Sequence, residues 1–139
     1  MPINLDDVML NKSASIERSL RRAQEELKMD PDLNIYTHID AFTLNIERAC
    51  QAAIDLAIHV CSVYHLGVPQ TSADAFRILE KSHMLSKETA KAMVSMVGFR
   101  NIAIHEYQQI DLAVLRFIVR EGWLSFVRFA AELGIEIRP

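Results

Sequence analysis

Four side chains that can bind phosphate or act on it fall within eight residues, at Arg100, Asn101, His105 and Tyr107. Arginine offers a planar, permanently charged fork that matches a phosphate group, and histidine exchanges a proton near neutral pH. Asparagine adds a donor and an acceptor, and tyrosine adds a phenolic hydroxyl. These residue types together suit a site that binds a phosphodiester and moves protons around it.

The spacing of these residues limits how one chain can use them. In a continuous helix Arg100 and His105 would lie about 140° apart, and His105 and Tyr107 about 200° apart. The segment forms one site if the helix unwinds near His105, or if a second copy of the segment completes the site. The spacing also allows a plainer interpretation, a basic helix end whose Arg100 and His105 satisfy terminal carbonyl groups while Tyr107 is half buried.

The elements around this segment read as helices, and no strand is expected. Apolar residues recur at helical spacing, which predicts an all-α antiparallel bundle of about five helices forming a single domain over residues 1–139. Asn4 is the expected N-cap of the first helix, and Gly67 the expected stop of the second. The predicted helices run from about Leu5 to Met29, from about Ile39 to Leu66, from just after Thr71, from Ser86 towards Gly98, and from Asp111 to Gly134.

Composition excludes several classes of protein. Half of the 139 residues are apolar and 24% are charged, the mix of an ordinary globular domain. The formal net charge of −3 argues against a large non-specific nucleic-acid surface, although a local basic cleft stays possible. No signal peptide or membrane span is expected. Cys50 and Cys61 share one predicted helix about 16 Å apart, too far to pair, which fits a reducing cytoplasm.

Two helix faces point away from the predicted core. A polar stripe on the second helix is either a solvated face or, with Asp55 above all, part of a cleft wall. On the fifth helix Phe117 and Leu124 face outward, as a contact with another chain or as chance exposure. The polar stripe consists of Arg48, Gln51, Asp55, His59 and Ser62.

Metal and nucleotide signatures are weak. Cys61 and His65 are four residues apart, but without a second ligand cluster they make a poor zinc site, so no metal is expected. No glycine-rich phosphate loop is present, so the chain is not expected to bind ATP by itself. Arg18, Arg21 and Arg22 are interpreted as a solvated face rather than an RNA track.

The segment Arg100–Tyr107 resembles the Arg-x4-His-x-Tyr signature of the HEPN superfamily, specifically of its HepT-like toxins. The resemblance covers about residues 36 to 130. It includes the run at 52–57, the turn at 67–69 and Gly98-Phe99 directly before the motif. All three signature positions match.

This resemblance implies a HEPN-like helical bundle with a metal-independent endoribonuclease activity, acting as the toxin of a type VII-like toxin–antitoxin pair. It also implies a homodimer that sets two motifs across a shared cleft. The implied partner is a minimal nucleotidyltransferase (MNT) antitoxin, which neutralises the toxin by transferring AMP from ATP to Tyr107. No cofactor is expected in the chain itself, because the antitoxin uses the ATP.

Under this resemblance each motif residue acquires a role. Arg100 would bind the scissile phosphate, and His105 would be the general base or acid. Asn101 would orient one of them, and Asp55 would hold Arg100 from behind. The alternative function is a non-catalytic subunit that binds a nucleotide or substrate for a separate nucleotidyltransferase. Growth arrest on expression of this chain alone would be expected only for the toxin.

Overall fold

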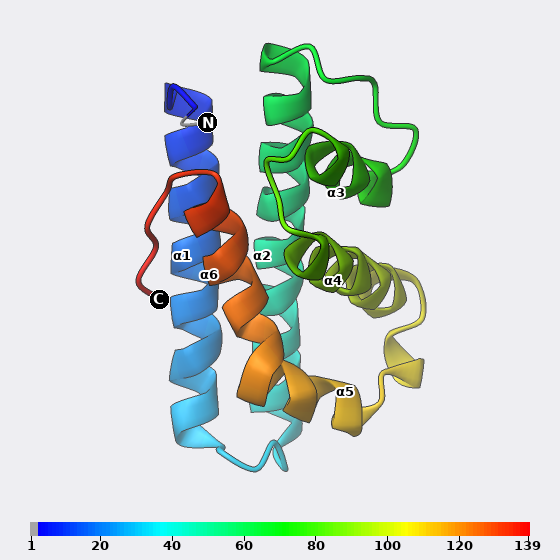
Figure 1. The fold of residues 1–139 in the computed structure, drawn as a ribbon. Helices are drawn as coiled ribbons and strands as arrows, with labels where there is room; N and C mark the ends of the chain where they lie inside the picture. Colours follow the sequence, from blue (N-terminus) through cyan, green and yellow to red (C-terminus); the bar gives the residue numbers. More distant parts are fainter. Residues whose placement is uncertain (1–2) are drawn as a thin grey trace.

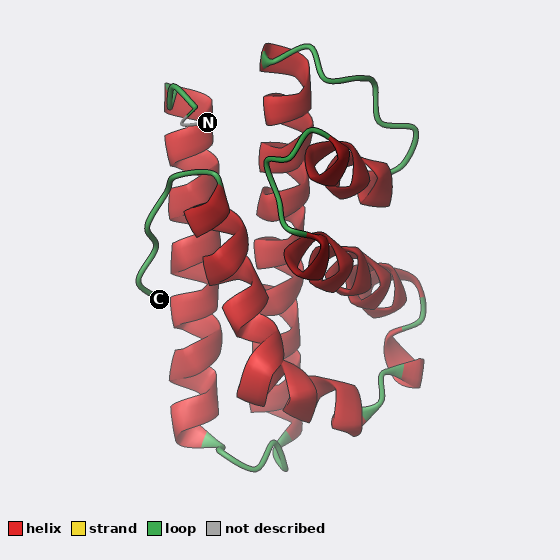
Figure 2. Ribbon diagram, viewed as in Figure 1, coloured by secondary structure: helices red, strands yellow, loops and turns green. Residues whose placement is uncertain are grey.

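The computed structural model describes residues 3–139, and within that range the chain is helical without a strand (Figures 1 and 2). The all-α prediction is confirmed. None of the described helices combines the length and apolarity that a membrane crossing needs. The α-helices are α1 (Asp7–Met29), α2 (Tyr36–Val63), α3 (Ser72–Lys81), α4 (Lys87–His105), α5 (Leu112–Phe117) and α6 (Trp123–Glu132).

The two longest helices, α1 and α2, lie antiparallel along the molecule and share its most extensive interface (Figure 1). The N-cap of α1 is Asp6, whose carboxylate accepts from the Met9 amide at 2.9 Å. The prediction of Asn4 as N-cap is therefore wrong. The other carboxylate oxygen of Asp6 contacts His59 Nε2 of α2 at 2.7 Å, and this hydrogen bond lowers the pKa of Asp6. One capping residue thus also joins the two helices.

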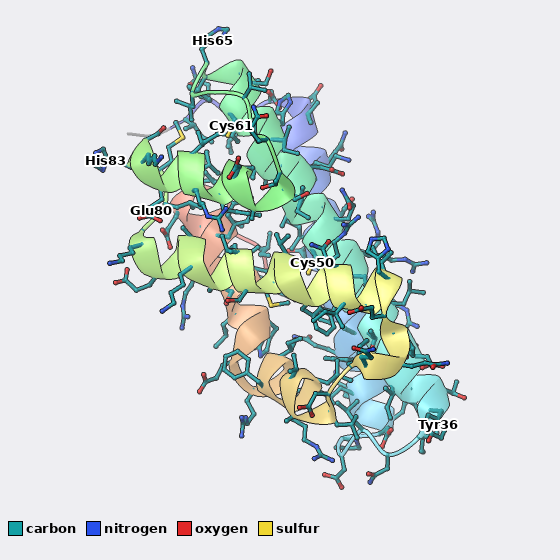
Figure 3. All side chains as sticks on the ribbon, turned by 90° about the vertical axis from the view of Figure 1, so that its right-hand side faces the viewer. Tyr36, Cys50, Cys61, His65, Glu80 and His83 are labelled. Atoms are coloured by element: carbon teal, nitrogen blue, oxygen red, sulfur yellow. The ribbon has the colours of Figure 1, made fainter. Side chains whose placement is uncertain are left out.

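Helices α3 and α4 lie across α2 rather than antiparallel to it (Figures 1 and 3), so the simple antiparallel bundle is only part of the architecture. Helix α4 also packs against α3 and α6. Its start is tied to the end of α6, because Glu132 accepts from the Ser86 amide at 2.6 Å and from the Thr89 hydroxyl. These contacts fix where α4 begins.

The predicted fifth helix is interrupted. A π-helical turn, Ile118–Gly122, separates α5 from α6. Gly122 is buried here, and a Cβ atom added to it would lie 3.2 Å from Ile118 Cγ1. The turn bends the chain so that α5 approaches the far end of α4, while α6 runs back across α1 and α2 (Figure 1). This bend is the physical reason that one predicted helix becomes two.

The second helix also ends earlier than predicted, at Val63 rather than near Leu66. His65 adopts a left-handed conformation with φ of 53°, and the Leu66 amide then donates back to the Cys61 carbonyl at 2.9 Å. This is the hydrogen bond of a Schellman-type helix end, formed here around a histidine. Gly67, with φ of 142°, continues the turn rather than starting it.

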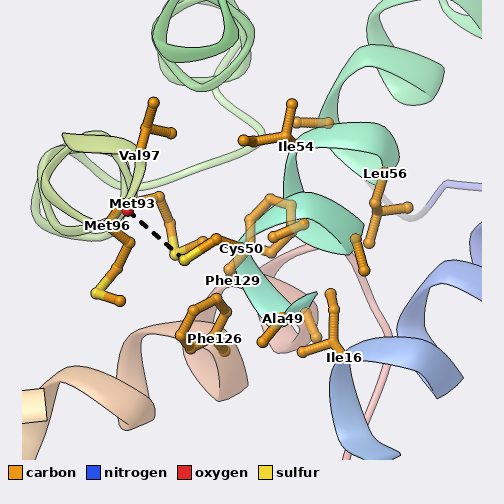
Figure 4. Packing of buried hydrophobic residues seen from close by; sticks show 14 of the residues in the cluster. Ile16, Ala49, Cys50, Ile54, Leu56, Met93, Met96, Val97, Phe126 and Phe129 are labelled. Carbon is orange, nitrogen blue, oxygen red and sulfur yellow. Dashed lines mark hydrogen bonds between the residues drawn. The ribbon is translucent and has the colours of Figure 1, made fainter. Parts of the chain in front are cut away.

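The core is built where α4 and α6 meet the α1–α2 pair (Figure 4). Phe76 and Phe129 meet edge to face, with ring centroids 5.3 Å apart. Cys50 lies in this core and its thiol contacts the Met96 carbonyl of α4 at 3.5 Å. Both cysteines are free and buried, as the sequence predicted. The core residues labelled in Figure 4 are Ile16, Ala49, Cys50, Ile54, Leu56, Met93, Met96, Val97, Phe126 and Phe129.

The tie between Glu132 and the start of α4 gives a stability prediction. Glu132→Ala should lower the free energy of unfolding by about 1–2 kcal/mol, because a backbone amide and a hydroxyl at a helix start lose their acceptor. Urea denaturation followed by circular dichroism measures the change. Glu121→Ala, an exposed glutamate on the adjoining π-helical turn, is the matched control and should stay within about 0.5 kcal/mol of the parent chain. Equal effects of the two changes would contradict this role of Glu132.

Candidate functional site

Helix α4 continues through Gly98 and ends only at His105, where the Glu106 amide still donates to the Ile102 carbonyl at 2.8 Å. The prediction that this helix stops near Gly98 is wrong. Gly98 is exposed, and no atom lies within 4 Å of the position that a Cβ atom would take there. Phe99 and Ala103 are buried and hold the last turns of α4 against the core. The segment Arg100–His105 is therefore regular helix.

A regular helix separates Arg100 from His105. Five residues correspond to about 140° of rotation and about 7.5 Å of rise. Arg100 is partly buried on the side facing α2, whereas His105 is exposed at the last residue of the helix. The helix unwinds only after His105, where the chain turns at Glu106, so this unwinding leaves Arg100 and His105 on one regular helix. One chain keeps its arginine and histidine on different faces.

Arg100 lies between its neighbour Asn101 and helix α2. Its Nη1 donates to Asn101 Oδ1 at 3.1 Å, so the structure does bring Asn101 and Arg100 together. Its Nε is buried and has no hydrogen-bond partner in the described chain. A buried guanidinium N–H without an acceptor leaves binding capacity for an anionic group.

Helix α2 supplies the electrostatic surroundings of Arg100. Burial raises the pKa of the Glu47 carboxyl, and the charges of Arg100 and Arg48 offset part of that rise. Burial likewise raises the pKa of the Cys50 thiol, again with a smaller opposing effect of Arg100. The thiol of Cys50 therefore stays protonated. Cys50 is a packing residue beneath the site, consistent with its place behind α4 in Figure 3.

Tyr107 opens the short 3₁₀ turn Tyr107–Gln109 (η1) that follows α4. Its side chain is 42% exposed, and its hydroxyl donates a hydrogen bond to Asp40 Oδ1 on α2. Burial of the ring, followed by the hydrogen bond and charge of Asp40, raises the pKa of Tyr107 to about 12. Glu47 adds a smaller effect in the same direction, so one carboxylate influences both Arg100 and Tyr107. The phenol is neutral at physiological pH.

A cleft of about 310 Å³ lies beside Tyr107. The start of α2 forms one wall, and the chain from η1 into α5 forms the other. Most of its walls are apolar, with Asp40 and the tyrosine hydroxyl as polar features. Tyr36, at the first residue of α2, lies on the same side of the molecule as the end of α4 (Figure 3). The remaining lining residues include Ile39, Thr43, Ile110, Leu112 and Leu115.

Asp55 does not hold Arg100, and that expectation is wrong. Its carboxylate accepts from Lys12 Nζ at 3.2 Å and from Gln51 Nε2 at 2.8 Å. Together with the contact between His59 and Asp6, this makes the polar stripe of α2 a seam that faces α1. Asp55 and His59 thus contact α1, while Arg48 and Ser62 at the ends of the stripe are exposed.

Sequence reasoning missed two acidic residues that do face the motif, Asp40 and Glu47. They are seven residues apart on α2, which places them within about 20° of each other on one helix face. That spacing was a signal available in the sequence. Nothing local, however, indicated that this face, rather than the longer polar stripe, would meet the motif.

Apolar side chains surround the motif on the outside of the molecule. They come from the end of α4 and from α5, and each is between 39% and 47% exposed. Phe117 is among them as predicted, whereas Leu124 is half buried and lies outside this set. Exposed apolar side chains near a motif are typical of a surface that meets another chain. The set is Ile102, Ile104, Leu112, Val114 and Phe117.

Within residues 3–139, no three histidine, cysteine or acidic side chains gather in an arrangement that could hold a metal ion. The thiol of Cys61 is buried and contacts the Ala75 carbonyl at 3.7 Å. His65 lies beyond the end of α2, in the turn after it.

Comparison with known proteins identifies relatives over nearly the whole chain. A family model described as ribonuclease HepT-like matches residues 10–133. The mRNA nuclease HepT of Shewanella oneidensis is 33% identical over 138 residues, covering 95% of this chain and 100% of the relative. The tRNA nuclease HepT of Aphanizomenon flos-aquae is 27% identical, covering 78% of this chain and 76% of the relative.

Solved structures agree with this match. The tri-AMPylated HEPN toxin of Shewanella oneidensis in complex with its MNT antitoxin superposes with a TM-score of 0.88 at 31% identity. The match covers 94% of this chain and 98% of that toxin. A toxin–antitoxin crystal structure with AMP-PNP gives a TM-score of 0.87 at 31% identity, covering 93% of this chain and 98% of that one.

The contact between Tyr107 and Asp40 predicts a measurable titration. Asp40→Asn should bring the pKa of Tyr107 down from about 12, towards the ordinary value near 10, because the negative charge beside the phenol is lost. The ring stays partly buried, so part of the rise should persist. NMR of chains carrying ¹³C-labelled tyrosine resolves the three phenols separately. A Tyr107 titration curve that is the same in both chains would contradict the contact.

Proposed function

The chain belongs to the HepT-like ribonuclease family, and we propose that it is the endoribonuclease toxin of a toxin–antitoxin pair, with its cleavage site formed by two copies of the motif. Two HepT relatives are named as nucleases, and a structural relative is a HEPN toxin held by an MNT antitoxin. We also propose that residues 1–139 form a single domain, which the match of the family model over residues 10–133 supports. Its free cysteines suit the cytoplasm, where RNA is available.

One observation carries the two-copy site: α4 is regular up to His105, so a single chain turns Arg100 and His105 in different directions. The exposed apolar residues of α4 and α5 around the motif supply a surface on which a second copy can pack. A two-fold axis through that surface brings two arginines and two histidines to one cleft. We therefore propose a symmetric homodimer.

The reaction that fits these groups is an internal transfer in RNA. One His105 takes the proton of a ribose 2′-hydroxyl, and the 2′-oxygen attacks the adjacent phosphorus. The bond from phosphorus to the 5′-oxygen breaks, and the second His105 gives that oxygen a proton. Arg100, aligned by Asn101, neutralises the charge that builds on the phosphate oxygens. The products are a 2′,3′-cyclic phosphate and a 5′-hydroxyl.

Control of this activity is proposed to act through Tyr107. The structural relative is AMPylated and bound to an MNT antitoxin, and Tyr107 presents an accessible hydroxyl two residues beyond His105. A partner MNT-type nucleotidyltransferase would use ATP to attach AMP to this hydroxyl. The attached AMP brings one negative charge and an adenine ring next to the motif. Its phosphate competes with RNA phosphate for Arg100.

The two-copy site predicts how an inactive chain affects an active one. His105→Ala chains, unfolded and refolded together with parent chains, should reduce RNA cleavage with the square of the parent fraction, because both histidines serve one cleft. With half of each chain, about a quarter of the activity should remain. A fluorescent RNA substrate measures the rate, and light scattering checks that mixed dimers form. A linear fall to one half would show that each chain cleaves independently.

The chemistry of the motif predicts cleavage without a metal ion. The purified chain should cut RNA in excess EDTA and leave 2′,3′-cyclic phosphate ends, detectable by mass spectrometry of the fragments. Arg100→Ala and His105→Ala should each lower the rate by at least about 100-fold while the helical circular dichroism signal persists. Arg116→Ala, an exposed arginine of α5, is the matched control and should cleave like the parent chain. Cleavage that stops with EDTA and returns with Mg²⁺ would contradict this mechanism.

A further inference from the structure

The hydroxyl of Tyr107 is held by a residue 67 positions away in the sequence, the Asp40 carboxylate. Asp40 lies in the second turn of α2, where Phe42 and Ile46 are buried and fix the helix on the core. Tyr107 lies in η1, whose backbone is closed by the Gln109 amide donating to the Glu106 carbonyl at 2.8 Å. Both partners thus belong to ordered backbone, and their contact is part of the fold.

We propose that Asp40 is the proton acceptor for Tyr107 when its hydroxyl attacks the α-phosphate of a nucleoside triphosphate held by a partner transferase. This inference rests on the proposed control of the toxin through Tyr107. The bond from the phenolic oxygen to the α-phosphorus forms, and the bond from that phosphorus to the oxygen of the β-phosphate breaks. Pyrophosphate leaves with the electron pair of the broken bond. The phenolic proton passes to a carboxylate oxygen of Asp40.

The need for a base follows from the state of the phenol. Tyr107 is neutral at physiological pH, and a neutral phenol is a weak nucleophile. Its proton must leave as the bond to phosphorus forms, and a base already hydrogen-bonded to it can receive that proton without rearrangement. Asp40 is in that position before any partner binds. Glu47 acts on Tyr107 only through its charge and makes no direct contact with the hydroxyl.

Attachment of AMP to Tyr107 breaks its contact with Asp40. Once the phenolic oxygen carries a phosphate, it can no longer donate a hydrogen bond to Asp40. Asp40 then passes the proton it received to water and becomes a carboxylate again, beside a negatively charged phosphodiester, and like charges at contact distance repel. The modified side chain must therefore leave Asp40. Asp40 first accepts the proton of Tyr107 and then, as a carboxylate, repels the modified side chain from the wall of the cleft.

Asp40→Asn tests the proposal, because an amide keeps the size of the side chain and can still accept a hydrogen bond, but cannot take up the proton. The assay follows AMP incorporation by intact mass, with the full-length chain, a partner MNT-type nucleotidyltransferase and ATP-Mg²⁺. We expect the kcat of AMP transfer to fall by about 100-fold, the lower end of general-base effects, with little change in the KM for the chain. Asp40→Glu should recover part of the rate.

Asp32→Asn is the matched control, since Asp32 is an exposed carboxylate in the loop before α2, and its transfer rate should stay within twofold of the parent. Circular dichroism confirms the fold of each variant. If Asp40→Asn loses helical signal, Asp40→Ser is measured in the same assay. A parent-like kcat in folded Asp40→Asn or Asp40→Ser overturns the role of Asp40, and so does a change confined to KM. Either result leaves the proposed function intact. Absence of any AMP on the parent chain overturns the proposed control through Tyr107 as well.

Discussion

The arrangement of the site depends on one constraint, the unbroken hydrogen bonding of α4 as far as His105. A regular helix turns Arg100 towards α2 and leaves His105 exposed at its end. The chain then changes direction at Glu106, so that Tyr107 returns to α2 and reaches Asp40. The proposed roles in phosphate binding, proton transfer and modification thereby fall at three positions on one short segment. The separation of arginine from histidine is also the reason for proposing that a second copy of the chain takes part in cleavage.

Helix α2 is the platform on which this division rests. Its buried face packs in the core and includes Cys50, which meets the Met96 carbonyl directly beneath the motif. The adjoining face presents Asp40 to Tyr107 and Glu47 to the charge of Arg100. The charge of Arg100 offsets part of the rise in the pKa of Glu47, and burial together with Asp40 raises the pKa of Tyr107. The face that looks towards α1 carries the ion pair between Lys12 and Asp55 and the hydrogen bond between His59 and Asp6, which join the two long helices.

The sequence predicted features that depend on neighbouring residues and did not predict contacts between distant segments. Helical spacing predicted the all-α class, and the motif predicted which segment carries the chemistry; the contact between Asn101 and Arg100 is likewise a neighbour effect. Contacts between distant segments were not accessible. The sequence analysis paired Asp55, on the polar stripe of the second helix, with Arg100, but the carboxylate of Asp55 contacts Lys12 of α1. The hydrogen bond between Asp40 and Tyr107 depends on the chain reversing after α4, and no local pattern encodes that reversal.

The account joins cleavage and control on a single surface, and one measurement tests that union directly. The chain is incubated with its partner MNT-type nucleotidyltransferase and ATP, the transferase is removed, and the fraction of chains carrying AMP on Tyr107 is read by peptide mass spectrometry. RNA cleavage by the same preparations is then compared with that fraction. The account predicts that activity falls as modification rises and is lost when every chain is modified. Fully modified chains, free of the transferase, that cut RNA as fast as unmodified chains would contradict it.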